Sequence, residues 1–277
     1  MKNFEPEDLL REKLYNQEEI TFHESVIETK TVLGIDIYKY SDYPSEIQTY
    51  IPVLFNELYR LTTETCIRKE NFIFDIYGNS LDFFKTHFIS TGDGGFQIFD
   101  NPLQAIIFAT YFQAYVRRLN SKSYSSNIMI NLCNIIGKIE LRYAISTDKI
   151  YSYDNNFYGS AIINNARILA KDHLNRLLLD SSSLNWFDQN LNTIENLLVY
   201  TRADIVKLDY FSNYDVKNKS LMFEKNKIRT IDVLKIGNIS SKNTMLDIYN
   251  VKLQVHLEVL KKSFVVTIGN LNTQGIE

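Results

Sequence analysis

The spacing of apolar residues along the chain predicts alternating strands and helices. Short apolar runs rich in β-branched residues predict strands at 31–40, 87–99, 137–147, 150–153 and 175–182, with 87–99 folding back on itself as a hairpin. Apolar residues three and four positions apart predict helices at about 44–65, 103–119 and 159–174. The order βαββαβα predicts an α+β sandwich in which helices cover one sheet.

Pattern changes divide the chain into three segments. Residues 1–29 are charged and weakly periodic, which predicts a peripheral lead-in. Residues 30–204 carry the strands and helices of the main domain. Residues 205–277 combine polar turns with an apolar-rich stretch, and we expect a small appended unit whose role the sequence does not indicate.

Composition excludes several classes of protein. The 277 residues are 45% hydrophobic and 23% charged, as in a folded globular protein. Because the net charge is only −3 and Lys and Arg are scattered, no nucleic-acid partner is expected. No run approaches the roughly 18 apolar residues that span a bilayer, and Cys66 and Cys133 stand alone, so we expect a cytoplasmic protein without a membrane partner.

Two carboxylates stand at positions that neighbouring strands would bring together. Asp36 lies near the end of the first strand, and Asp93 lies in the turn of the hairpin, among Gly92, Gly94 and Gly95. Glycines let phosphate oxygens approach the backbone, and Mg²⁺ and Mn²⁺ prefer hard oxygen ligands. The pair therefore indicates triphosphate chemistry, although each residue taken alone is better explained as a strand-end cap or a turn former.

Four motifs in order resemble the class III nucleotide cyclases, the family of adenylate and guanylate cyclase catalytic domains. They are GIDIYKYS, STGDGGFQIF, LRYAIST and YGSAIINNARIL, within residues 31–186. The resemblance implies a ferredoxin-like βαββαβ core and makes residues 30–204 a catalytic domain. It also implies attack of a ribose 3′-hydroxyl on the α-phosphate, with release of pyrophosphate and assistance from two Mn²⁺ or Mg²⁺ ions.

Site residues follow from the same resemblance. Asp36 and Asp93 match the metal-binding carboxylates, and the carbonyl of Ile37 matches a further metal contact. The phosphate-binding amides fall on the segment after Ile37, at positions that include Tyr38, Tyr40 and Ser41. Tyr38 and Tyr40 are also candidates for stacking on the base. Arg167 matches the arginine that stabilises charge on the α-phosphate. The alternative is that it is an exposed helical arginine without a catalytic role.

Three positions depart from the family pattern. The asparagine that orients the ribose is replaced by Ile163, with Asn164 beside it as a substitute. Ile89 and Asn156 occupy the two purine-reading positions, and an apolar residue with an amide cannot reproduce that donor and acceptor pattern. The chain therefore resembles the Pycsar antiphage cyclases, which implies UTP or CTP as substrate, and cyclic UMP or cyclic CMP as a signal to a downstream effector.

Assembly follows from the way in which class III sites are built. The carboxylates come from one subunit and the arginine from the other, so a single chain with both sets implies a homodimer with two equivalent composite sites. Lys207 is a candidate for a late phosphate contact. Two other hypotheses stay open: an adenylate cyclase with altered base recognition, and a catalytically inactive nucleotide-binding module.

Overall fold

The computed structural model describes residues 27–78, 80–124, 126–153, 156–199, 227–241, 244–257, 264–270, 272 and 274–276. The described strands are β1 (Ile27–Ile37), β2 (Phe88–Ser90), β3 (Gly94–Phe99), β4 (Leu141–Tyr153), β5 (Asn156–Tyr158), β6 (Leu177–Asp180), β7 (Lys227–Ser241), β8 (Thr244–Leu257) and β9 (Phe264–Ile268). The α-helices are α2 (Ser45–Gln48), α3 (Ile51–Lys69), α4 (Leu81–Lys85), α5 (Pro102–Asn120), α6 (Asn127–Ile136), α7 (Ser160–Lys171) and α8 (Ser181–Val199).

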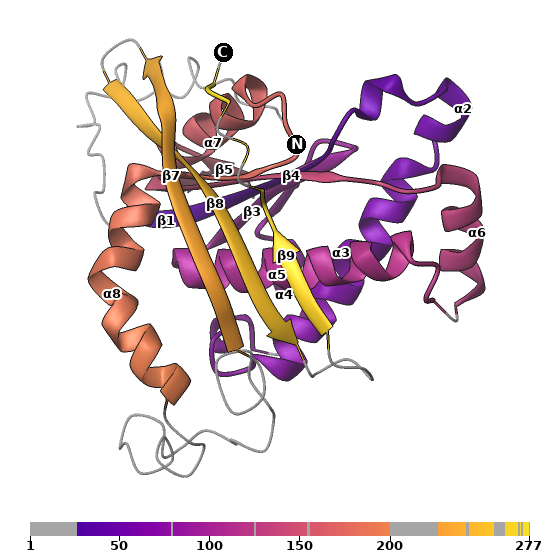
Figure 1. The fold of residues 1–277 in the computed structure, drawn as a ribbon, viewed down its shortest axis with the longest axis horizontal. Coiled ribbons are helices and arrows are strands. Elements are labelled where there is room, and N and C mark those ends of the chain that lie inside the picture. The colour runs from indigo at the N-terminus through magenta and orange to yellow at the C-terminus, as the bar shows by residue number, and fades with distance from the viewer. Residues whose placement is uncertain are drawn as a thin grey trace, which may run out of the picture.

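All described strands belong to one sheet with the order β2-β3-β1-β4-β6-β8-β7, to which β5 is added beside β4 and β9 beside β8 (Figure 1). Its first four strands are antiparallel throughout. Together with α3 and α5 they follow the chain order βαββαβ, which is the ferredoxin-like arrangement. The prediction of an α+β sandwich around this core is confirmed.

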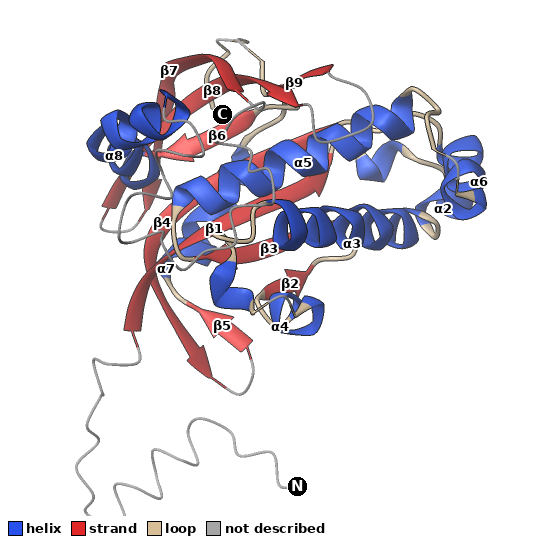
Figure 2. Ribbon diagram, turned by 90° about the horizontal axis from the view of Figure 1, so that it is seen from below, coloured by secondary structure: helices blue, strands red, loops and turns tan. Residues whose placement is uncertain are grey.

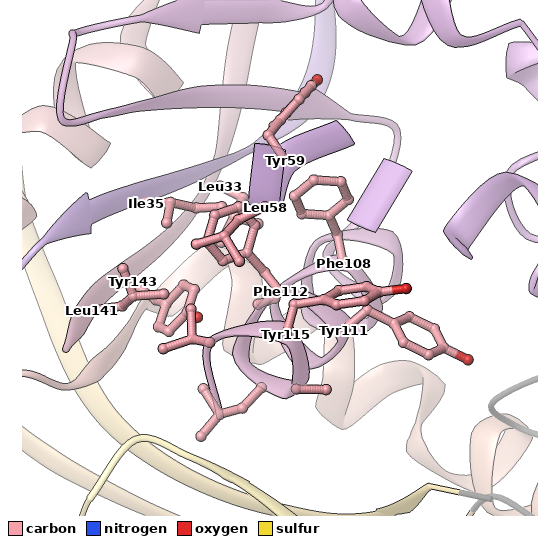
Figure 3. Packing of buried hydrophobic residues seen from close by; sticks show 14 of the residues in the cluster. Leu33, Ile35, Leu58, Tyr59, Phe108, Tyr111, Phe112, Tyr115, Leu141 and Tyr143 are labelled. Atoms are coloured by element: carbon pink, nitrogen blue, oxygen red, sulfur yellow. The ribbon is translucent and has the colours of Figure 1, made fainter. Parts of the chain in front are cut away.

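Apolar residues at successive positions of β1 explain why helices cover both faces of the sheet. Leu33 and Ile35 are fully buried in the main core with residues of α3 and α5 (Figure 3). Val32 points to the opposite face, where it packs with Ala161 of α7. Figure 2 shows α3 and α5 side by side over one face, with α7 behind the sheet. A strand buried on both faces is apolar at successive positions.

Several boundaries differ from the prediction. The helix expected at 44–65 is split into α2 and α3, because Pro52, in the first turn of α3, favours a new helix start there. The strands expected at 137–147 and 150–153 form the single strand β4. Helices α6 and α8 were not predicted from the sequence. Among the described residues, no helix has the length and apolar character needed to cross a bilayer.

Strands β7, β8 and β9 extend the same sheet. Strand β8 pairs with β6, with Leu177 opposite Val251, and β7 and β9 flank β8 on its two sides. This described part of the predicted C-terminal unit therefore shares its sheet with the main domain. The predicted boundary after residue 204 and the candidate Lys207 lie outside the described residues, as do residues 1–26 of the predicted lead-in.

Candidate functional site

Strand pairing brings the two predicted metal carboxylates together at one end of β1. Asp36 lies opposite Gly94 of β3, and the amide of Ile37 donates a hydrogen bond to the carbonyl of Asp93 at 3.2 Å. A Cβ at Gly94 would overlap the carbonyl of Ile35, so this approach requires glycine. Gly92, with φ of 101°, makes the turn that holds Asp93.

The electrostatics of Asp93 show how close the carboxylates lie. Burial, together with the charge and hydrogen bond of Asp36, raises the pKa of Asp93 to about 6, against the opposing charge of Arg142. Two carboxylates that share a site cannot both ionise freely, so the pair attracts a cation. The side chain of Asp36 is 16% exposed and therefore remains within reach of a ligand.

Arg142 of β4 is a third charged residue of this site, and sequence reasoning missed it. It lies opposite Asp36 in the sheet, and its Nε donates to Asp36 Oδ2 at 2.8 Å. Its Nη1 donates to the carbonyls of Asp172 at 2.6 Å and Leu169 at 3.2 Å, at the end of α7. In the sequence, the LRYAIST motif shows only that one arginine lies in a mostly apolar strand, and it does not indicate the partner of that arginine.

A pocket of about 410 Å³ opens over these side chains. Its lining comprises Asp36, Ile37, Tyr38, Lys39, Tyr40, Ser41, Asp42, Asp93, Arg142 and His173. The segment after β1 turns sharply at Lys39, whose φ of 58° is left-handed, and enters a 3-10 helix at Tyr40–Asp42. The structure thus gathers the predicted metal residues and the predicted phosphate segment around one cavity, here called the carboxylate pocket.

The donor set of the carboxylate pocket fits a magnesium or manganese ion. Asp36 and Asp93 offer hard oxygens, and Ile37 adds a backbone carbonyl beside them. No group of three or more His, Cys, Asp or Glu side chains suited to a metal occurs in the part of the chain that the structure describes. The two carboxylates therefore fit an ion whose remaining ligands are substrate phosphates and water, as is common for Mg²⁺.

The predicted catalytic residues of α7 lie elsewhere. Neither Asn164 nor Arg167 is among the residues that line the carboxylate pocket of its own chain. The amide of Asn164 donates to Asp148 Oδ2 at 3.3 Å, and the side chain of Arg167 is half-buried. Ile163, at the position of the missing asparagine, is 51% exposed. Within one chain these residues do not complete the site.

The two predicted base-reading residues also lie away from the carboxylate pocket. Ile89 pairs with Phe96 in the hairpin and packs on the smaller core cluster around Val32. Asn156 is exposed in β5, where its Oδ1 accepts from the amide of Phe157 at 2.9 Å. The structure leaves both side chains at a surface of the sheet.

Asn165 fixes α7 on the sheet, although sequence reasoning had not singled it out. Its buried amide donates to the carbonyls of Val32 and Ala144 at 2.8 and 2.9 Å. A Cβ at Gly34 would overlap Asn165 Oδ1 and lie 2.7 Å from Leu169 Cδ1. Helix α7 can therefore press against β1 only because position 34 has no side chain, and its last turn then reaches Arg142.

Comparisons with known proteins return structural likeness only. No family model matches the chain, and no curated protein matches it. It is similar to an adenylate/guanylate cyclase/hydrolase from Silicibacter pomeroyi, with 13% identity, 81% of this chain and 96% of that chain covered, and a TM-score of 0.44. It is also similar to the adenylyl cyclase CyaB from P. aeruginosa, with 11% identity, 81% and 95% covered, and a TM-score of 0.45. At these values no activity follows from the likeness.

Proposed function

We propose that this chain is a nucleotide cyclase that converts a pyrimidine nucleoside triphosphate, UTP or CTP, into its 3′,5′-cyclic monophosphate and pyrophosphate. The observation that carries the proposal is the pair Asp36 and Asp93, held side by side in a pocket by β1, the β2–β3 turn and Arg142. Two carboxylates in contact, with the positively charged Arg142 beside them, suit a ligand that combines metal ions with phosphates.

The carboxylate pocket supplies metal ligands, positive charge and backbone amides to this reaction. Asp36, Asp93 and the carbonyl of Ile37 hold Mn²⁺ or Mg²⁺, which when bound supplies charge neutralisation and acidifies the attacking hydroxyl. Arg142 and Lys39 supply fixed positive charge for the phosphate oxygens. The backbone amides of Lys39, Tyr40 and Ser41 orient the triphosphate chain, since this segment forms the pocket wall, whereas the amide of Tyr38 already donates to the carbonyl of Glu140 at 2.9 Å.

A second protomer completes the site. Arg167 and Asn164 lie outside the carboxylate pocket of their own chain, so they serve the reaction only if another copy presents them. A homodimer with a twofold axis supplies both halves twice, and Arg167 then stabilises charge on the α-phosphate. Ile89 and Asn156 face the base across the same interface.

The pyrimidine preference rests on what the base-reading positions lack. Ile89 has no polar group, and the side chain of Asn156 is exposed with its oxygen already bonded to the backbone. A purine-selective site needs buried polar groups that pair with the base. Of the pyrimidines, UTP is the preferred substrate of the proposal, and cyclic UMP is then the messenger that activates a separate effector in antiphage defence.

The test is to incubate the purified protein with Mn²⁺ and each of ATP, GTP, CTP and UTP in separate reactions, and to identify products by mass. Cyclic UMP or cyclic CMP alone supports the proposal. Cyclic AMP as the main product overturns the pyrimidine assignment and supports an adenylate cyclase with altered base recognition.

A second candidate is a nucleotide-binding module without catalysis. The observation that favours it is the ion pair between Arg142 and Asp36, which occupies one carboxylate oxygen that a metal ion would use. Such a module binds a triphosphate in calorimetry and forms no cyclic product. Catalytic turnover that Asp93→Asn abolishes, in a variant that still folds, excludes this candidate.

A further inference from the structure

A second pocket of about 450 Å³ lies at the opposite end of β1 from the carboxylate pocket. It is lined by Glu28, Lys30, Ile76, Tyr77, Phe83, His87, Ile98, Phe99, Asp100, Ile150, Tyr151, Ser152 and Phe157. None of these residues belongs to the proposed cyclase site. We call this cavity the aromatic pocket, and its volume is in the range that accepts a small organic molecule.

Apolar side chains at the rim of the aromatic pocket are unusually exposed. Ile76 and Phe83 are each 45% exposed, and Tyr151 is 43% exposed. They come from the 3-10 helix at Asp75–Tyr77, from α4 and from β4, so three separate elements present apolar surface to one cavity. Apolar surface gathered around a cavity marks a binding site more often than scattered exposed residues do.

His87 gives the aromatic pocket a directional polar group. Its ring lies 5.0 Å from that of Phe83 and 5.5 Å from those of Tyr77 and Phe157. Nδ1 lies 3.0 Å from the carbonyl of Phe83 and 3.1 Å from the hydroxyl of Thr86. Because that hydroxyl donates to the same carbonyl at 2.7 Å, both neighbours of Nδ1 accept, which places the proton of the neutral ring on Nδ1. Nε2 is then an acceptor, surrounded by aromatic rings that favour a flat ligand.

The charged residues of the aromatic pocket are unbalanced. Lys30 Nζ lies 2.6 Å from Asp100 Oδ1 and 3.0 Å from Glu28 Oε2, so one ammonium faces two carboxylates. The excess negative charge attracts a cation and repels the phosphates of a nucleotide. Aromatic faces also favour a cation close to them.

We propose that the aromatic pocket binds a small aromatic amine in its protonated form. The ring lies against Phe83 and Phe157 and donates to His87 Nε2, and the ammonium group lies against Asp100 and Glu28. This assignment uses none of the proposed catalytic residues, so it stands or fails independently of the cyclase activity.

The test titrates tryptamine into the purified full-length protein by isothermal titration calorimetry, with indole-3-acetate as the probe of opposite charge. Tryptamine is expected to bind saturably, and at least about fivefold more tightly than indole-3-acetate, because close charge and cation–π contacts contribute about 1 kcal/mol, which is roughly fivefold in affinity. Absence of saturable tryptamine binding, or equal binding of the acid, overturns the proposal.

Phe83, which is exposed, and Asp100, which is partly exposed, allow the pocket to be altered outside the buried core. Phe83→Ala should weaken tryptamine about fivefold, and its matched control is Ile128→Ala, at another exposed apolar side chain on α6. Asp100→Asn should reduce the preference for tryptamine over indole-3-acetate, with Asp188→Asn on α8 as its control. Unchanged affinity in both pocket variants, or displacement of tryptamine by UTP, overturns the assignment.

Discussion

The two ends of β1 carry pockets of similar size and opposite chemistry. The carboxylate pocket has a volume of about 410 Å³ and mostly polar walls, in which Asp36 and Asp93 lie beside Arg142. At the aromatic pocket, about 450 Å³ is enclosed by aromatic rings around His87. One strand therefore supports a site suited to metal and phosphate at one end and a site suited to a flat amine at the other, and the two should respond to different substitutions.

The largest expected effect separates the pockets by activity. Asp36→Ala and Asp93→Ala should each lower the proposed cyclase activity about a thousandfold, roughly 4 kcal/mol, because each removes a proposed ligand of the ion that would stabilise the transition state. Tryptamine affinity should not change, because neither residue lines the aromatic pocket. Initial rates of cyclic nucleotide formation measure the effect.

Asp188→Ala is the control for this loss, since it removes an exposed carboxylate from α8, outside both pockets. An Asp93→Ala enzyme with wild-type turnover would remove the basis of the metal assignment. A variant that loses tryptamine binding together with activity would instead show that the two ends of β1 are coupled.

The next effect concerns the assembly of the carboxylate pocket. Arg167→Ala and Asp93→Ala homodimers should both be inactive, because each lacks one half of every composite site. Co-expression should restore about a quarter of wild-type activity, since about half of the dimers are mixed and each mixed dimer has one intact site. Activity of the co-purified mixture, measured against each single variant, provides the readout.

Co-expression that restores nothing, or an Arg167→Ala homodimer with full activity, would contradict the composite site. The aromatic pocket provides the internal reference here as well. All of its lining residues come from one chain, so every dimer in the mixture should bind tryptamine equally.

The sequence predicted the carboxylate pocket better than the rest of the molecule because its residues lie in short, contiguous motifs. Asp36 and the phosphate segment are adjacent in the chain, and Asp93 lies in a glycine turn. Arg142 escaped because its partnership with Asp36 exists only through the register of β1 and β4. Register is set by pairing across more than one hundred residues, which no local pattern records.

The aromatic pocket could not be predicted from the sequence for the same reason. Its walls come from six separate elements, and Phe83, His87 and Phe157 have the local pattern of ordinary apolar or structural positions. Helix α8 was missed although its sequence has apolar residues at helical spacing, at Leu184, Phe187, Leu191, Ile194 and Leu198, whereas α5 was predicted from a long apolar repeat after Pro102. The place of β7, β8 and β9 in the sheet depends on contacts with β6, far from them in sequence.

A smaller effect uses Asp180, a buried carboxylate outside both pockets. Burial raises the pKa of Asp180 from 3.8 to about 6, with a further contribution from the charge of Asp148. Because the folded-state pKa lies above the unfolded one, the stabilisation is complete below about pH 4 and is lost as the pH rises through 6. The loss is at most roughly 3 kcal/mol.

Asp180→Asn should flatten this part of the stability profile, although it also weakens the acceptors for the amides of Thr147 and Ser183. Urea unfolding of the wild-type protein and of Asp180→Asn between pH 4 and 7 gives the free energy of unfolding as a function of pH. The difference between the two slopes reports Asp180 alone, because Asp93 contributes equally to both proteins. Parallel profiles would show that Asp180 does not titrate in this range.

The smallest effect tests the middle of β1, between the two pockets. Gly34→Ala should lower the free energy of unfolding by about 2 kcal/mol, because the new methyl group overlaps Asn165 and crowds Leu169, and overpacking of this kind costs about 1–3 kcal/mol. Gly275→Ala, where the nearest atom to a new Cβ is 3.5 Å away, is the matched control and should change stability little.

Since α7 ends at the carbonyls that Arg142 binds, Gly34→Ala should also impair cyclase activity while leaving tryptamine affinity unchanged. Equal loss at both pockets would mean that β1 transmits the strain in both directions, and that the two ends are one cooperative unit.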